Sequence, residues 1–311
     1  MAQGYAVYVG DVALDEYYRT DFWPTIKDKA LVQPLPAMPG GMIANAACVA
    51  AGLGMQVKFL AALNRGAITQ FLLADLEKSG VDTSLVVFDD TLPDAKCMIF
   101  LVGDEHTVLI PTMGITAIEI TAEQLDVLAR ASYIYSTPIE FELLRCGTMN
   151  SDDIIDYCRR HGAQLVYDLD VDYINDGDEA RYRRLDVAFF NEVGFDRYRG
   201  GLDARAAADR LLSYGIQVVV VTLAERGCVV YERTQTIAVP GVAVTVVDVT
   251  GAGDTFCSSF VYARAVGMEL RAAAEFATAS AARCVGQLGA RVYSPTACPP
   301  CRGQAGAIGS K

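Results

Sequence analysis

Residues 247–267 read VDVTGAGDTFCSSFVYARAVG, and the rest of the chain is arranged around this stretch. It begins with the end of a β-branched run, crosses a glycine-rich turn and continues as a predicted helix. The small residues Gly251, Ala252 and Gly253 leave backbone N–H groups uncovered where the helix begins, which together with the helix dipole favours phosphate binding. Asp254 adds a carboxylate in the first turn, where it could accept the proton of a hydroxyl that attacks a bound phosphoryl group.

This stretch also fits a purely structural helix start, whereas two other kinds of nucleotide site fit it poorly. Glycine-rich turns open many helices, and an aspartate in the first turn commonly complements the helix dipole. A nucleotide-binding P-loop is disfavoured because no Gly-Lys-Ser/Thr follows the glycines. A dinucleotide fingerprint is disfavoured because GxGxxG is absent and the loop lies far from the N-terminus.

The composition indicates a large hydrophobic core and excludes some partners. With 311 residues and 52% hydrophobic content, the chain predicts one large α/β domain, or a large domain with a smaller appendage. The net charge of −12 argues against non-specific binding to nucleic acid or to anionic membranes. We find no membrane span and no signal peptide in the sequence, and therefore expect a cytoplasmic protein.

Nine cysteines are scattered mostly through apolar segments, a pattern typical of reduced, buried thiols rather than of a disulfide framework. Cys298 and Cys301 form one close pair, but no second pair or nearby histidine completes a zinc site. A polar tail is favoured there over a metal or redox site.

The first part of the chain predicts a ligand site and a small second sheet. Residues 5–9 form a buried strand, and Asp11 and Asp15 follow at its end, where open α/β sheets bind ligands. Residues 16–38 are aromatic, polar and rich in proline, which favours exposed strands of a flap. Residues 97–111 read as a hairpin around a polar loop containing His106, to which we assign little catalytic weight.

A second glycine pair opens a helix of small residues that begins after Gly40-Gly41, carries Asn45 one turn inside and ends at Leu53-Gly54. Such a helix can pack close to a sheet, and its glycines let a ligand touch the backbone. From residue 121 onward, predicted helices and strands alternate, which indicates a mostly parallel sheet covered by helices.

These two motifs carry a resemblance to the PfkB/ribokinase family of carbohydrate kinases over about residues 5–295. The C-terminal signature of the family appears here as residues 248–254, DVTGAGD, and its N-terminal signature as residues 40–54. The resemblance implies a ribokinase-like αβα sandwich with a small β-sheet lid. Residues 1–295 would form this single domain, with lid strands drawn from about 16–38 and 96–111, and residues 296–311 a polar C-terminal tail.

The resemblance also implies transfer of the ATP γ-phosphoryl group to a sugar hydroxyl. Asp254 would be the general base and Gly251, Ala252 and Gly253 the anion hole. The remaining implied positions are Asp15, Gly41 and Asn45 for the sugar and Asn191, Thr222, Gly227 and Thr278 for the nucleotide. Mg²⁺ would accompany ATP, and a monovalent cation such as K⁺ would lie near Asp248, Thr250 and Gly289.

The sequence departs from the family pattern at three places, which bear on the metal and the nucleotide more than on the reaction. Gly194 stands where the family often has a glutamate, with Glu192 as a displaced substitute, and Ala224 stands where it often has a glycine. The alternating acids Asp168, Asp170 and Asp172 either touch metal-bound water or are solvated residues at a strand end. We favour the solvated interpretation.

The kind of sugar acceptor is predicted from the absence of a lysine after the glycine pair. Phosphosugar kinases of the family tend to carry a lysine directly after the glycine pair, and Met42 stands there. We therefore expect an unphosphorylated sugar that is ribose-, fructose- or ketodeoxygluconate-like. The aromatic residues Tyr17, Tyr18, Phe22 and Trp23 would pack on a nucleobase or on one another, so a nucleoside kinase stays an alternative, as does a catalytically weak sugar-binding regulatory protein. A homodimer through the lid is the one protein partner considered.

Overall fold

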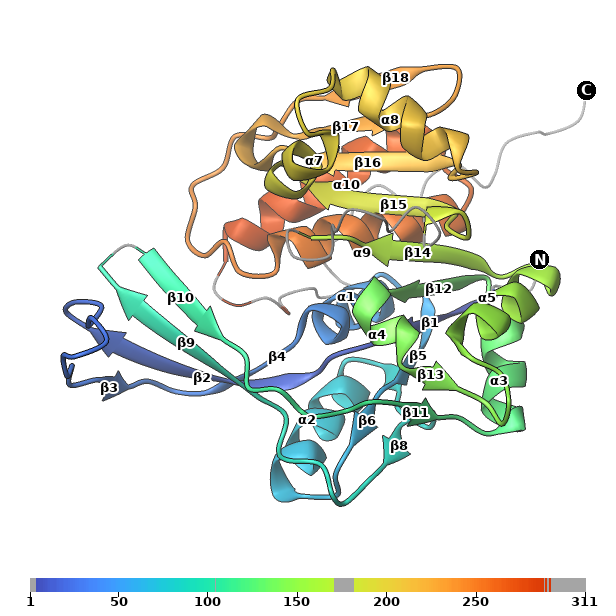
Figure 1. Ribbon diagram of the computed structural model, residues 1–311. Coiled ribbons are helices and arrows are strands. Elements are labelled where there is room, and N and C mark those ends of the chain that lie inside the picture. Colours follow the sequence, from blue (N-terminus) through green and yellow to red (C-terminus); the bar gives the residue numbers. More distant parts are fainter. Residues whose placement is uncertain (1–3, 104, 171–181, 288, 290, 292–311) are drawn as a thin grey trace, which may run out of the picture.

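The central sheet has the mostly parallel arrangement expected from the sequence (Figure 1). The computed structural model describes residues 4–103, 105–170, 182–287, 289 and 291. From one edge to the other, the sheet contains β18 (Thr236–Val239), β17 (Cys228–Tyr231), β16 (Val218–Thr222), β15 (Val187–Asn191), β14 (Gln164–Asp168), β12 (Tyr133–Ser136), β1 (Tyr5–Val9), β5 (Gln56–Leu60) and β7 (Val81–Asp82). Neighbours from β16 to β7 are parallel, whereas β17 and β18 form an antiparallel hairpin that pairs antiparallel with β16.

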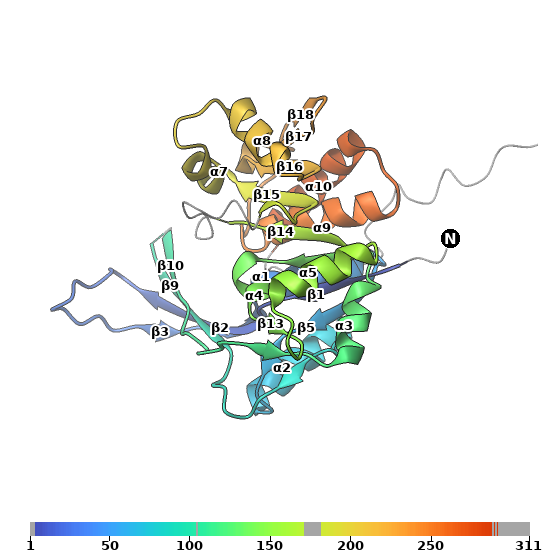
Figure 2. The same ribbon diagram turned by 45° about the vertical axis from the view of Figure 1, so that its right-hand side comes forward.

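Helices cover both faces of this sheet, because its strands are apolar on both sides (Figure 2). Successive residues such as Tyr8 and Val9, or Val219 and Val220, belong to opposite cores. One face packs against α1 (Met42–Gly52), α2 (Ala67–Lys78), α9 (Ala252–Ala265) and α10 (Leu270–Val285). The other packs against α3 (Ala122–Ala129), α4 (Pro138–Glu142), α5 (Ser151–Arg160), α7 (Glu192–Arg199) and α8 (Ala204–Ser213).

The second, smaller sheet extends away from the body of the molecule (Figure 1). It contains β2 (Ala13–Thr20), β3 (Gln33–Pro34), β4 (Met38–Gly40), β9 (Lys96–Val102) and β10 (Glu105–Leu109). The central pair, β2 and β9, is parallel, and β9 and β10 form the predicted hairpin. We call this sheet the lid.

Short elements complete the described chain: β6 (Ala62–Leu63), β8 (Val87–Phe88), β11 (Ile118–Glu119), β13 (Leu144–Arg145) and a 3-10 turn at Ala224–Arg226. The seven cysteines within the described residues are free thiols, as expected. Cys298, Cys301 and the predicted tail 296–311 lie outside the described residues. Within the part of the chain described, every helix is too short or too polar to cross a membrane.

Candidate active site

Asp254 and Asn45 meet where the first turns of α9 and α1 approach each other. Asn45 Nδ2 donates a hydrogen bond of 2.9 Å to Asp254 Oδ2, although the two residues are 209 positions apart. Below them, the hydroxyl of Ser258 on α9 donates to the carbonyl of Ala46 on α1 at 2.6 Å and lies 2.8 Å from the hydroxyl of Tyr8 on β1. These buried bonds fix the two helices against the central strand and thereby bring the two sequence motifs together.

The beginning of α9 has the geometry of an anion site. Gly251 adopts a left-handed conformation with φ of 75° as the helix N-cap, and Ala252 N–H donates to Val249 O at 3.3 Å. Thr255 N–H makes the first regular bond of the helix, to Gly251 O. The N–H groups of Gly253 and Asp254 have no acceptor among the described residues, and a Cβ built at Gly253 would meet nothing within 4 Å. Open space therefore lies beside unpaired donors, which fits a phosphoryl group.

Asp254 holds a carboxyl whose charged form is disfavoured in the ligand-free chain. Burial raises its pKa, the Asn45 N–H lowers it, and the negative charges of Asp168, Asp11 and Asp170 raise it further, to about 8. A base whose pKa lies near the working pH is suited to proton transfer.

The glycine pair at the start of α1 is fixed by Asp11, which the sequence analysis placed at a strand end without assigning it a role. Its carboxylate accepts the N–H groups of Met42 and Ile43 at 3.0 and 2.9 Å, and so caps the helix. Gly41 has φ of 98°, and a Cβ there would lie 2.7 Å from Val12 Cα. Only glycine fits this position without displacing the backbone.

Asp15 lies on the lid strand β2, against Gly40 of β4. A Cβ built at Gly40 would lie 2.0 Å from Asp15 Oδ2, so the glycine makes room for the carboxylate. Burial and the charge of Asp11 raise the pKa of Asp15 to about 6, and the cation of Arg291 opposes them. Arg291, which the sequence analysis did not single out, also donates from Nε to Asn45 Oδ1 at 2.9 Å.

The predicted nucleotide positions gather at the ends of β15, β16 and β17. Asn191 and Thr222 are neighbours in the parallel ladder. Asn191 Oδ1 accepts the N–H of Gly194 at 2.7 Å as the cap of α7. Gly227 has φ of 95°, and a Cβ there would lie 2.1 Å from Val239 O. Thr278 is buried on α10 and donates to Ala274 O at 2.8 Å, so its hydroxyl is already engaged within its helix.

Two departures from the family pattern have local physical consequences. A Cβ at Gly194 would lie 2.8 Å from the carbonyl oxygen of Asp170, so a glutamate does not fit there unless the backbone moves. The carboxylate of Glu192, the displaced substitute considered above, is paired with Arg226. Among the described residues, Ala224 is the non-glycine residue with a positive φ, which is 51°. Glycine adopts this conformation at a lower free-energy cost.

The interpretation of the acids after β14 as solvated residues is wrong for Asp168. This carboxylate is buried and accepts a hydrogen bond of 2.9 Å from the Tyr135 hydroxyl. Burial raises its pKa to about 6, and that hydrogen bond opposes the rise. Asp170 is paired with the side-chain amide of Asn191 at 2.5 Å, and Asp172 lies outside the described residues.

The three positions proposed for a monovalent cation do come together. Asp248 accepts the N–H of Thr250 at 2.9 Å with one carboxylate oxygen and the N–H of Gly289 at 2.9 Å with the other. Although burial raises the pKa of Asp248, these bonds outweigh it and lower the pKa below its ordinary value. The carboxylate thus ties the loop before α9 to the segment after α10. No cluster of three or more acidic, histidine or cysteine side chains suited to a metal occurs within the described residues.

The lid aromatic residues divide between two faces, because side chains alternate along β2. Tyr18 stacks on Phe100 at 5.3 Å and Trp23 meets the same ring edge-on at 5.5 Å, so both pack within the lid. Tyr17 shares the other face with Asp15, and burial together with the charge of Asp15 raises its pKa to about 12.

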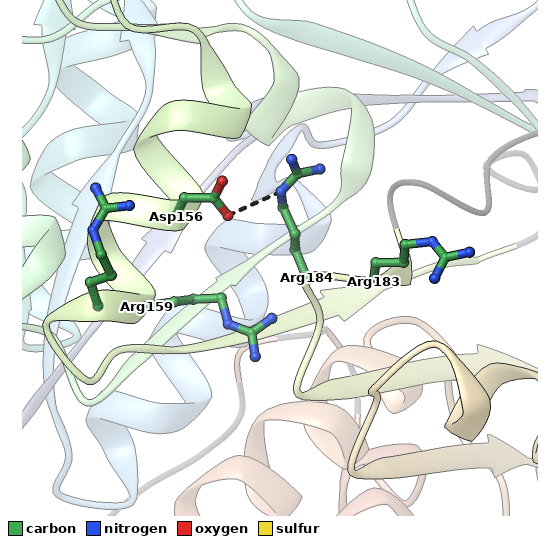
Figure 3. Close-up of a pocket in the computed structure, with 5 residues that line it drawn as sticks. Asp156, Arg159, Arg183 and Arg184 are labelled. Carbon is green, nitrogen blue, oxygen red and sulfur yellow. Dashed lines mark hydrogen bonds and ion pairs between the residues drawn. The ribbon is translucent and has the colours of Figure 1, made fainter.

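A separate basic pocket lies at the opposite end of the strands, beside the beginning of β14 and β15 (Figure 3). Its volume is about 440 Å³, and it is lined by Asp156, Arg159, Arg160, Arg183 and Arg184. Ion pairs link Arg184 to Asp156 at 3.1 Å and Arg159 to Asp186 at 3.3 Å. None of the predicted site residues lines it, so it is not the site assembled above.

Comparison with known proteins gives concordant results. The sequence model of a family described as pfkB family carbohydrate kinase matches residues 6–297. Fructokinase-1 of Zea mays is 29% identical over 257 residues, covering 78% of this chain and 79% of the relative. Among solved structures, Arabidopsis thaliana ribokinase complexed with ribose and ATP superposes with a TM-score of 0.78 at 21% identity, covering 94% of this chain and 96% of that one. A putative ribokinase II from E. coli in complex with ATP and Mg²⁺ gives 0.76 at 15% identity, covering 94% and 96%.

Proposed function

Because the chain belongs to the pfkB family of carbohydrate kinases, we propose that its site transfers the ATP γ-phosphoryl group to a sugar hydroxyl with Asp254 as the general base. The family makes the chain a phosphotransferase with an alcohol group as acceptor. The observation that carries the residue assignment is the contact of Asn45 with Asp254 beside the open, unpaired N–H groups of α9.

In the proposed reaction, Asp15 and Asn45 hold the sugar and Asp254 orients one hydroxyl. As the sugar oxygen bonds to the γ-phosphorus, its proton passes to the Asp254 carboxylate, the bond from the γ-phosphorus to the bridging oxygen breaks, and ADP leaves. The unpaired amides of Gly253 and Asp254, at the anion hole implied for residues 251–253, would meet charge that develops on the transferred oxygens. The lid would exclude water, which otherwise competes as acceptor.

We infer that ATP binds at the ends of β15 to β17, with Asn191, Thr222 and Gly227 in contact with it. The E. coli protein bound to ATP and Mg²⁺ supports Mg²⁺ as the accompanying ion. Asp170, which follows β14 and is bonded to Asn191, would contact its water ligands. When bound, Mg²⁺ would neutralise charge on the phosphates. Nearby positive charge would also lower the pKa of Asp254, and so favour the ionised form that accepts the proton.

We further propose an unphosphorylated sugar as the acceptor, one that is ribose-, fructose- or ketodeoxygluconate-like. The sugar side of the site contains the acidic side chains of Asp11 and Asp15, which disfavour a second phosphate group, and the nearby cation Arg291 is already paired with Asp75. Carboxylates and amides instead suit hydroxyl groups, to which they offer acceptors and donors.

Two finer proposals concern the surroundings of the site. A monovalent cation such as K⁺ would be held by the loop that Asp248 ties together. A homodimer would form through the lid, because large apolar side chains in and beside the lid strands are exposed to solvent. Among them are Ile26, Leu31 and Ile110, which are 104, 97 and 78% exposed.

The testing experiment is ADP release from Mg-ATP across a panel of pentoses, hexoses, aldonic acids, sugar phosphates and nucleosides, each with and without K⁺. Strong turnover with one unphosphorylated sugar or aldonic acid is the expected result, and turnover with a sugar phosphate alone would contradict it. Turnover with a nucleoside alone would support a nucleoside kinase. Thermal stabilisation by a sugar without turnover would support a catalytically weak sugar-binding protein.

A further inference from the structure

Arg291 joins three other segments of the chain at the sugar side of the site. Its Nε donates to Asn45 Oδ1 of α1 at 2.9 Å, and one terminal nitrogen donates to the Gly40 carbonyl of β4 at 2.7 Å. The other terminal nitrogen pairs with Asp75 of α2 at 2.5 Å. The side chain is 11% exposed, so these bonds form with little competition from water.

The bond to Asn45 determines which end of its amide faces Asp254. A guanidinium has only donors, so it donates to the oxygen end of the Asn45 amide and cannot bond to the nitrogen end. With Oδ1 held by Arg291, Nδ2 is the end that meets Asp254, as observed at 2.9 Å. Asn45 makes no other side-chain hydrogen bond among the described residues, so without Arg291 the single bond to Asp254 would be left to orient the amide.

The charge of Arg291 also matters, because the sugar side is otherwise acidic. Burial raises the pKa of Asp11 and of Asp15, and in both cases the guanidinium of Arg291 opposes the rise. Loss of this cation would leave Asp75 unpaired and would strengthen the mutual repulsion of the remaining carboxylates.

We propose that Arg291 is a positioning residue for phosphoryl transfer, which keeps the Asn45 amide donating to Asp254 and holds Gly40 beside the sugar. The inference rests on the proposed roles of Asp254 and Asn45 and adds a residue that touches neither the transferred phosphoryl group nor ATP. Its effect is therefore expected in kcat and in KM for the sugar, with KM for ATP unchanged.

A second consequence is a shifted pH profile. The Asn45 amide of α1 donates to Asp254, and the titratable groups that face it are Asp11 after β1, Tyr135 on β12, Asp168 and Asp170 at the end of β14, Cys257 on α9 and Cys284 on α10. The Asn45 N–H is the favourable contact for the ionised form, since the three carboxylates oppose it. An amide that turns away withdraws this donor, so the acid limb of the kcat profile moves to higher pH.

The test is a double-mutant cycle with Arg291→Ala, Asn45→Ala and the double variant, read out as sugar-dependent ADP release. Arg291→Ala is expected to lower kcat about 10- to 100-fold, the scale of a slightly misplaced catalytic group. Arg291→Lys should recover part of this loss, because it keeps the charge but cannot make three directed bonds. In the Asn45→Ala background, Arg291→Ala should lower kcat by a clearly smaller factor, because only its contacts with Gly40 and Asp75 remain to be lost.

The matched control is Arg271→Ala, which removes an arginine that is 59% exposed on α10 and should leave kcat unchanged. The proposal would be overturned if Arg291→Ala lowered kcat by the same factor in the presence and in the absence of Asn45. It would also be overturned if the Arg291→Ala variant were as active as the wild type. If Arg291→Ala does not fold, Arg291→Lys takes its place in the cycle.

Failure of the proposed function would look different, since the wild-type protein itself would turn over no acceptor. The same four proteins would then be unfolded in urea. A midpoint shift of the double variant smaller than the sum of the single shifts supports the Asn45–Arg291 bond, and an additive shift overturns it.

Discussion

Replacing Asp254 with asparagine should stabilise the ligand-free protein while it removes phosphoryl transfer. Burial and the charges of Asp168, Asp11 and Asp170 raise the pKa of Asp254 from an ordinary 3.8 to about 8. The unfolded chain regains the ordinary value, so between these pH values the unfolded chain is ionised where the folded one is not. The free energy of unfolding therefore falls as the pH rises from about 4 to about 8, and levels off above that.

The size of this effect follows from the two pKa values. One pKa unit corresponds to about 1.4 kcal/mol, so the full difference sets an upper limit of about 6 kcal/mol above pH 8. At pH 6 the wild type has already lost about half of this free energy of unfolding. Up to about 3 kcal/mol is therefore lost between pH 6 and pH 9. Asparagine is nearly isosteric, can still accept from Asn45 and does not ionise, so the variant escapes this loss.

The assay is urea unfolding of wild type and Asp254→Asn at pH 6, 7, 8 and 9, without ligands. The stability advantage of the variant should widen as the pH rises to about 8. Asp209→Asn is the matched control, since this carboxylate on α8 is 53% exposed and should give no widening. A constant difference between wild type and Asp254→Asn at all four pH values would refute the reasoning that the site opposes the Asp254 charge.

Two further predictions concern the supporting structure. Ala224→Gly should raise the free energy of unfolding in urea by about 0.5–1 kcal/mol, because glycine relieves the strain of the positive φ of 51°. The control Ala243→Gly, in a loop without positive φ, should lower the free energy of unfolding slightly. A destabilised Ala224→Gly variant beside a stabilised Ala243→Gly variant would contradict this. Tyr135→Phe removes the donor to buried Asp168 and should cost about 1.5–3 kcal/mol at pH 8. Because that hydroxyl favours the ionised carboxyl, whose pKa is about 6, the cost should shrink on going to pH 5, and a cost independent of pH would count against it.

Local patterns in the sequence were sufficient to predict the fold. The apolar runs at Tyr5–Val9 and Val218–Thr222 and the helices between such runs carry their own periodicity, so the parallel sheet and its covering layers could be predicted. The small sheet was also predicted, because prolines and aromatic residues in 16–38 are unlike a core helix. The family resemblance is confirmed by the match over residues 6–297.

The contacts within the site could be predicted only in part. Asp254 and Asn45 could be identified from the glycine motifs, because the conformation of each motif is local. That their side chains form a hydrogen bond with each other could not be predicted. Arg291 gives no local signal, because its partners lie 216 to 251 positions earlier in the chain. The burial of Asp168 also depends on packing, here against Tyr135 of a neighbouring strand, so an acid at a strand end was misinterpreted as solvated.

The central claim is that Asp254 takes the proton from a sugar hydroxyl as it receives the γ-phosphoryl group. The direct measurement follows the γ-phosphoryl of ATP into the sugar phosphate by ³¹P NMR, for wild type and Asp254→Asn, after calorimetry has shown that both bind sugar and ATP. The account predicts sugar phosphate formation by the wild type and a rate about 10²–10⁴ times lower in the variant. Near-normal phosphorylation by Asp254→Asn would contradict it.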